Sequence, residues 1–171
     1  MEKEKLREIL TSLQNGEKSV KEALEDLESL PFKDMGYAKV DTHRDLRRGA
    51  PEAIYCEGKS ESQITEIIDE MEPSNSLLAT RVDPKVLKKI GQKYSNAHTY
   101  PESDLAFIGE FPEKTKGKIV VVTAGTTDIP VARKSEVTAR SMGVQVDTIF
   151  DVGVSGLHRV LDFRDPIAKA D

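Results

Sequence analysis

A short segment near the end of the chain carries residues that can hold an anion, residues 123–128, Thr-Ala-Gly-Thr-Thr-Asp. Gly125 permits a sharp turn or the close approach of a ligand. The hydroxyls of Thr126 and Thr127, together with the amides of the helix expected next, favour a phosphate. Asp128 can accept hydrogen bonds from ribose hydroxyls or cap that helix. A plain helix cap after a tight turn explains these residues equally well.

A second segment with chemical potential is residues 151–159, Asp-Val-Gly-Val-Ser-Gly-Leu-His-Arg. Gly153 and Ser155 belong to a turn, and Ser155 is placed to cap a further helix. His158 can transfer a proton near neutral pH. Arg159 can pair with a carboxylate or a phosphate. The alternative is a solvent-facing His-Arg pair at a helix start, which local sequence does not exclude.

Three other features are weaker candidates. Residues 41–49, Asp-Thr-His-Arg-Asp-Leu-Arg-Arg-Gly, could hold an anion, but a salt-bridged surface loop is the favoured interpretation. His98 has no partner in sequence and is expected to be structural. Cys56 lies in an apolar run, which favours a buried inert thiol over a nucleophile.

The elements around the two main segments predict a parallel sheet. Residues 118–123 form a β-branched run typical of a strand that is buried on both faces. A helix is expected at 129–142, a second strand at 144–152, and a further helix after Ser155. This β-α-β-α order is typical of doubly wound α/β domains, in which ligands bind beyond the carboxyl ends of the strands. We therefore expect the two segments to face one crevice.

The N-terminal part of the chain predicts a helical hairpin and a small α/β domain. Apolar spacing predicts the hairpin at residues 2–30, with a capping box at 19–22. Residues 38–110 mix short strands and helices and form the small α/β domain. A polar break at 112–117 marks the predicted boundary. The predicted domains are thus residues 1–117 and 118–171.

Composition excludes several classes of protein. The 171 residues have a net charge of −5 and no long Lys/Arg run, which argues against nucleic-acid binding. The N-terminus lacks a signal peptide, and no apolar run approaches the length that spans a membrane. A single cysteine excludes a disulfide framework and a Cys-rich zinc site. We expect a cytoplasmic protein without a membrane partner.

The quoted motifs resemble those of a known family. Residues 30–32 and 34–41, His43-Arg44 and residues 48–52 resemble the N-terminal half of the nickel-pincer cofactor biosynthesis family LarB. Residues 121–132 and 150–159 resemble its later part, so the resemblance covers nearly the whole chain. The implied fold is the start of a PurE-like, flavodoxin-like doubly wound sheet, as in aminoimidazole ribonucleotide carboxylase.

The resemblance implies a specific reaction, carboxylation of the pyridinium ring of nicotinic acid adenine dinucleotide by carbon dioxide or bicarbonate. The phosphoanhydride is hydrolysed as well, which releases AMP, and Mg²⁺ assists. By motif match, Thr127 and Asp128 contact the ribosyl-phosphate portion, within a substrate site that includes Gly125, Thr126, Gly153, Ser155 and Arg159. His158 occupies the position of a proton-transfer element. The resemblance also implies a homo-oligomer.

One departure from the family limits these expectations. The family's covalent cysteine lies downstream of the last residue of this sequence, Asp171, and Cys56 lies outside the matching motif. Two strands also make an incomplete parallel sheet. We therefore expect a fragment that does not carboxylate. Two alternatives stay open: a non-catalytic nucleotide-binding or regulatory module, and an aminoimidazole ribonucleotide carboxylase of the purine pathway.

Overall fold

The computed structural model describes residues 2–29, 33–40, 50–71, 76–113 and 116–171. The predicted α/β class is confirmed, with one mixed sheet and one parallel strand pair. The chain forms two compact units, residues 1–52 with 59–77, and residues 53–58 with 78–171. Packing alone does not define a folding domain, so the boundary expected at 112–117 stays a prediction.

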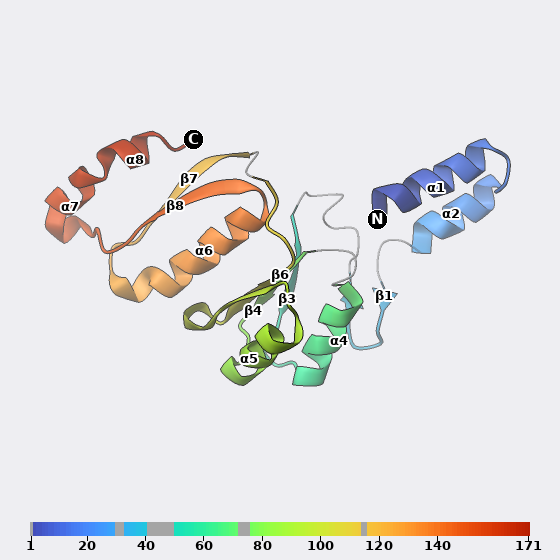
Figure 1. Ribbon diagram of the computed structural model, residues 1–171, viewed down its shortest axis with the longest axis horizontal. Helices are drawn as coiled ribbons and strands as arrows, with labels where there is room; N and C mark the ends of the chain where they lie inside the picture. The colour runs from blue at the N-terminus through green and yellow to red at the C-terminus, as the bar shows by residue number, and fades with distance from the viewer. Residues whose placement is uncertain (1, 30–32, 41–49, 72–75, 114–115) are drawn as a thin grey trace. The chain divides into compact units, whose positions relative to one another are not determined.

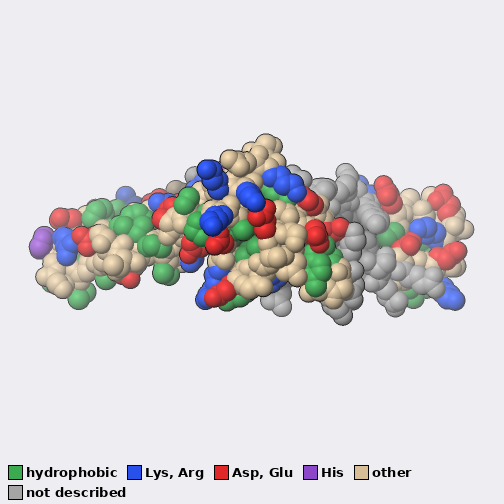
Figure 2. Space-filling view, turned by 90° about the horizontal axis from the view of Figure 1, so that it is seen from below, with side chains coloured by type: hydrophobic (Ala, Val, Ile, Leu, Met, Phe, Trp, Pro, Cys, Tyr) green, Lys and Arg blue, Asp and Glu red, His purple; other side chains and the backbone are tan. Residues whose placement is uncertain are grey.

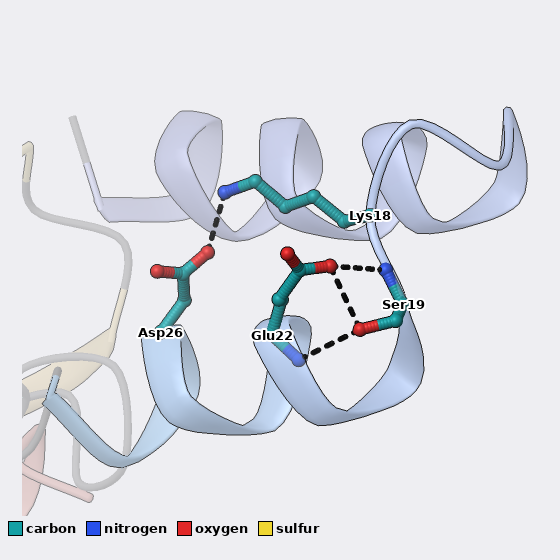
Figure 3. A network of polar contacts seen from close by, with 4 residues as sticks. All are labelled: Lys18, Ser19, Glu22 and Asp26. Atoms are coloured by element: carbon teal, nitrogen blue, oxygen red, sulfur yellow. Dashed lines mark hydrogen bonds and ion pairs between the residues drawn. The ribbon is translucent and has the colours of Figure 1, made fainter.

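The first unit begins with the predicted helical hairpin, α1 (Glu2–Gln14) and α2 (Val20–Ser29). Figure 3 shows the capping box at the start of α2. The Ser19 amide donates to Glu22 Oε2 at 2.8 Å, and the Glu22 amide donates to Ser19 Oγ at 3.2 Å. Lys18 and Asp26 form an ion pair beside it. The capping box is therefore confirmed, and it fixes where α2 begins.

The first unit also holds a small hairpin, β1 (Lys33–Asp34) and β2 (Lys39–Val40), and the helix α4 (Glu61–Met71). The Met35 amide donates to Ala38 O at 2.8 Å, which closes the turn between the two strands. The Tyr37 hydroxyl donates to Glu66 Oε2 on α4 at 2.6 Å. This bond ties the hairpin turn to the helix. The candidate anion segment 41–49 lies outside the described residues.

The second unit contains a mixed sheet of strand order β3-β4-β6-β5. The Cys56 amide donates to Thr80 O at 2.9 Å, so the C-terminal ends of β3 and β4 lie side by side. Helix α5 starts at Pro84, where the Asp83 carboxylate accepts from the Lys85 amide at 2.8 Å. The elements are β3 (Glu52–Tyr55), β4 (Leu77–Thr80), α5 (Pro84–Lys93), β5 (Ala97–Tyr100), η1 (Pro101–Ser103) and β6 (Leu105–Ile108).

The parallel pair of the second unit consists of β7 (Lys116–Val122) and β8 (Val144–Ile149), joined through α6 (Ile129–Ser141). Figure 1 shows α6 running along this pair. Val137 of α6 also joins the buried cluster of Leu78, Leu105 and Phe107 from the mixed sheet. Helix α6 therefore packs against both sheets.

The expectation that β7 is buried on both faces is wrong for the described residues. Ile119 is 36% exposed and Val122 is 46% exposed. Strand β7 pairs with β8 alone in the described part of the chain, so it is an edge strand with an open flank. At its start, the Asp171 carboxylate accepts from the Lys118 amide at 2.7 Å.

The chain ends with η3 (Val154–Gly156), α7 (Leu157–Asp162) and α8 (Arg164–Ala168). The predicted cap by Ser155 is wrong, because Ser155 falls inside η3 and no side chain caps α7. Exposed apolar side chains occur on these elements, and Figure 2 shows hydrophobic atoms on this part of the surface. Strand β8 ends at Ile149, three residues before the predicted end, since Asp151 turns the backbone with a φ of 59°.

Candidate functional site

Thr123 joins the two candidate segments at the carboxyl ends of β7 and β8. Its amide donates to Ile149 O at 2.9 Å, and its carbonyl accepts from the Val152 amide at 3.0 Å. Its hydroxyl oxygen accepts from the Asp151 amide at 3.1 Å. The residue is 4% exposed. Thr123 therefore holds the two segments side by side at the carboxyl ends of β7 and β8, and the expectation that they face one crevice stays a prediction.

Gly153 sets how closely the two segments approach each other. A Cβ atom at this position would lie 2.8 Å from the carbonyl oxygen of Ala124. That separation is shorter than a van der Waals contact, and the obstacle is backbone that cannot rotate away. Position 153 therefore requires a glycine because the Ala124 carbonyl of the first segment lies so close. The backbone conformation of Gly153 itself does not impose this requirement.

The first segment folds as the 3₁₀ turn η2 (Thr126–Asp128), which leads directly into α6. The Asp128 carboxylate accepts a hydrogen bond from the Gly125 amide at 3.2 Å, so Asp128 holds the turn. Gly125 has an extended backbone, with φ −133° and ψ 167°. The turn itself does not demand a glycine there, contrary to one expectation. Thr126, Thr127 and Asp128 are exposed beside the start of α6.

The second segment is organised by an ion pair between Arg159 and Asp151. Arg159 Nη1 donates to the Asp151 carbonyl at 2.7 Å and to Asp151 Oδ2 at 3.0 Å. The guanidinium also fills the space beside Gly156, where a Cβ would lie 2.6 Å from Arg159 Nε. Arg159 is thus held by an internal carboxylate, with further N–H donors left over for a ligand.

His158 and Ser155 are exposed on η3 and α7. Within the described residues, His158 makes no hydrogen bond or ion pair that would orient its ring. Ser155 likewise contributes no cap to the helix that follows it. The structure places both residues on the second segment, and their roles toward a substrate stay predictions.

Sequence reasoning missed Thr123 and Asp151 as organising residues. Thr123 reads as the last residue of a β-branched run, and Asp151 reads as a polar residue after the next strand. Their contact depends on the register in which Val122 pairs with Ile149. No spacing rule reveals such a register. The sequence does offer one signal for Thr123, because a residue with a hydroxyl group stands at the position where the apolar strand ends.

Metal and membrane sites find no support in the described residues. Across the described ranges, no group of three or more His, Cys, Asp or Glu side chains is arranged to hold a metal ion. Magnesium binding therefore stays a prediction. None of the described helices combines the length and apolar character needed to cross a bilayer.

Arranged in this way, the two segments offer hydrogen-bond donors of several kinds to a single ligand. The exposed Thr126 and Thr127 hydroxyls lie at the start of α6, where the helix dipole favours an anion. Arg159 adds a positive charge to the neighbouring segment. An anionic ligand, such as a phosphate ester, suits this set of groups better than a cation.

Two comparisons with known proteins bear on this chain. The sequence model of the LarB/PurE-like N-terminal domain matches residues 32–110, and the α/β fold with parallel strands is consistent with a PurE-like, flavodoxin-type fold. The chain is also 29% identical over 164 residues to an uncharacterized protein of Methanocaldococcus jannaschii. That similarity covers 91% of the chain, and the chain spans about 64% of the length of that curated relative.

Proposed function

We propose that this chain contributes a nucleotide-binding half-site to a carboxylase of the nickel-pincer cofactor pathway. The proposed substrate is nicotinic acid adenine dinucleotide, which is carboxylated on its pyridinium ring by carbon dioxide or bicarbonate and then hydrolysed to release AMP. The match of residues 32–110 to the LarB/PurE-like domain supports this assignment. So do the motifs at residues 121–132 and 150–159.

The observation that carries the proposal is the pinning of the two strand-end segments by Thr123. Three hydrogen bonds at this residue hold the segment with Thr127 and Asp128 against the segment with Arg159. A phosphoribosyl group carries a phosphate and neighbouring hydroxyls. The proposed binding mode places the phosphate toward the threonine hydroxyls, the α6 amides and Arg159, and the ribose hydroxyls toward Asp128.

His158 has the proposed role of moving a proton once the ring has been carboxylated. An exposed imidazole that has no hydrogen-bond partner among the described residues can turn toward a bound substrate. The proposed reaction also needs a thiolate that adds to the ring. Cys56 is 3% exposed and its thiol donates to Ile54 O at 3.8 Å, so it is a structural thiol within β3 and its flank. The proposal gives these 171 residues binding and proton transfer only.

A second candidate function is a nucleotide-binding module without chemistry of its own. The observation in its favour is the burial of Cys56, the single cysteine of the sequence. An aminoimidazole ribonucleotide carboxylase is a third candidate. Its substrate is a mononucleotide without a pyridinium ring, so substrate choice separates it from the first proposal.

Calorimetric titration of the chain tests the proposed function. We expect nicotinic acid adenine dinucleotide to bind and NAD and aminoimidazole ribonucleotide to bind more weakly. Arg159→Ala removes a charge-assisted contact to phosphate, which we expect to weaken binding by about tenfold or more. Lys134→Ala, at a half-buried position of α6, is the matched control for loss of one positive charge. Equal affinity for all three nucleotides, or equal loss in both variants, would contradict the proposal.

A further inference from the structure

The buried carboxylate of Glu136 lies in the middle of α6 and pairs with two arginines. Arg133 Nη1 contacts Glu136 Oε2, and Arg140 Nη1 lies 3.5 Å from Glu136 Oε1. The Glu136 side chain is 10% exposed. A buried carboxylate with two cationic neighbours has its charge compensated, so both guanidinium groups are held in fixed places.

The two arginines then extend in different directions along α6. The Arg133 guanidinium carbon lies 5.9 Å from the ring centre of Phe150, which is the residue directly after β8. The Arg140 guanidinium carbon lies 4.4 Å from the ring centre of Phe111, next to the mixed sheet. Both are within the range of a cation–π contact. One carboxylate thus anchors two stacked arginines, of which only one reaches the candidate site.

Arg133 also meets the mixed sheet through η1. Its Nε lies 3.8 Å from Glu102 Oε1, which is an ion-pair separation beyond hydrogen-bond length. The guanidinium is therefore bounded by Glu136, by Glu102 and by the ring of Phe150. Phe150 is followed at once by Asp151, whose backbone has a φ of 59° and whose carboxylate holds Arg159.

We propose that Arg133 is a positioning residue for the second segment of the candidate site. By holding the ring of Phe150, it fixes where the Asp151 turn begins, and through Asp151 it fixes Arg159. Glu102 extends this support to η1 of the mixed sheet. Arg133 itself does not touch the ligand. The effect of Arg133 on nucleotide affinity rests on the proposed function. Its effect on the Phe150–Asp151 turn does not.

Arg133→Lys and Arg140→Lys form a matched pair for the test. In each variant a lysine keeps the charge beside Glu136 but loses the planar guanidinium that stacks on a phenylalanine ring. We first measure amide hydrogen exchange at Asp151 and Val152 by NMR. A lost cation–π contact of ordinary strength corresponds to exchange that is about two- to fivefold faster. We expect that change in Arg133→Lys and no change at these amides in Arg140→Lys.

Nucleotide titration of the same variants supplies the second readout. If the wild-type chain binds nicotinic acid adenine dinucleotide, Arg133→Lys should weaken that binding by a similar factor, and Arg140→Lys should not. If the wild-type chain binds no nucleotide, the proposed function fails, and hydrogen exchange still decides the positioning role. Equal exchange rates in the two variants at Asp151 and Val152 overturn the inference. Glu102→Gln, at an exposed position, provides a variant that leaves Glu136 fully paired should Arg133→Lys not fold.

Discussion

The hydroxyl oxygen of Thr123 accepts a hydrogen bond from the backbone amide of Asp151 at 3.1 Å, across 28 residues of sequence. The Thr123 backbone is bonded to the same segment through Ile149 and Val152. One side chain at the end of β7 therefore specifies the start of the turn after β8. This contact connects the sheet, which the sequence encodes in its apolar runs, with the two polar segments, which carry the candidate chemistry.

Replacing Thr123 by Val tests that contact. Valine keeps the shape of the buried side chain but removes the acceptor, so the Asp151 amide is left unpaired. We expect a loss of about 1–3 kcal/mol in the free energy of unfolding, together with weaker nucleotide binding. Urea unfolding followed by circular dichroism measures the first effect, and calorimetry measures the second.

Thr138→Val on the exposed face of α6 is the control for the Thr123 variant. A surface substitution of this kind is expected to change stability by no more than about 0.5 kcal/mol. If Thr123→Val behaves like Thr138→Val in both measurements, the hydroxyl does not hold the two segments together.

Gly153→Ala should separate the two segments. The added Cβ would lie 2.8 Å from the Ala124 carbonyl oxygen, so backbone must move. We expect a cost of about 1–3 kcal/mol and a strong loss of nucleotide binding. Gly125→Ala is the matched variant, because its Cβ would lie 3.8 Å from Thr127 Oγ1 and its backbone is already extended. Urea unfolding should show that Gly125→Ala is tolerated.

The two glycines also separate a structural role from a binding role. Loss of nucleotide affinity in Gly125→Ala with unchanged stability would place a ligand close to that Cα. Similar unfolding curves for Gly153→Ala and the wild-type chain would show that the Ala124 carbonyl can shift with little loss of stability. In that case Gly153 does not set the separation of the segments.

Much of the fold could be predicted because it follows from local patterns. The hairpin of α1 and α2 follows from apolar spacing and the capping box at Ser19. The order β7, α6, β8 follows from a β-branched run, a helical segment and a second apolar run in sequence. These signals lie within a few residues of each other, so one sequence is enough to recognise them.

The features that the sequence did not reveal depend on contacts between residues that are far apart in the chain. Thr123 with Asp151, and Gly153 with Ala124, follow from strand register and not from composition. The packing of Val137 against Leu105 and Phe107 is of the same kind, because periodicity marks Val137 as buried without naming its partner sheet. The prediction that Ser155 caps the next helix was wrong for a local reason. Ser155 lies inside the 3₁₀ turn η3 and not at the residue before the helix.

The capping box at Ser19 predicts a pH dependence in the N-terminal hairpin. Hydrogen bonds from the Ser19 amide, and then from its hydroxyl, lower the pKa of the Glu22 carboxyl below its ordinary value of 4.5. A lowered pKa in the folded state stabilises the hairpin above the unfolded value. This contribution is lost as the pH falls from 4.5 through the lower folded value. Hydrogen exchange at the Ala23 amide, which is bonded to Ser19 O at 3.0 Å, reports on the first turn of α2.

Ser19→Ala should remove the capping hydroxyl and reduce that pH dependence, because the Ser19 backbone amide, which is the larger cause of the lowered Glu22 pKa, remains. Loss of an N-cap costs about 1 kcal/mol. The protection of the Ala23 amide, which is its exchange rate relative to the unstructured rate at the same pH, should therefore fall above pH 4.5 and depend less on pH below it. Ser19→Thr keeps a capping hydroxyl and should stay close to the wild-type chain. Equal exchange rates in the alanine and threonine variants would mean that the hairpin does not need its cap.

The hydrogen bond between Tyr37 and Glu66 predicts a tyrosine that titrates late. Donation of the phenol proton to the Glu66 carboxylate, with a smaller contribution from burial, raises the pKa of Tyr37 from 10.0 to about 12. A raised pKa means that the bond stabilises the fold fully below pH 10.0 and loses this effect as the pH approaches 12.

Ultraviolet titration of tyrosinate in the wild-type chain and in Tyr37→Phe should therefore differ mainly at the alkaline end. Glu66→Ala should shift that late component toward 10.0, and should change nothing when Tyr37 is already phenylalanine. The pKa values of Tyr55 and Tyr100 are raised as well, so the test is the loss of late absorbance in Tyr37→Phe and not its complete absence. Late absorbance that is unchanged in Tyr37→Phe would contradict the link between the β1–β2 turn and α4.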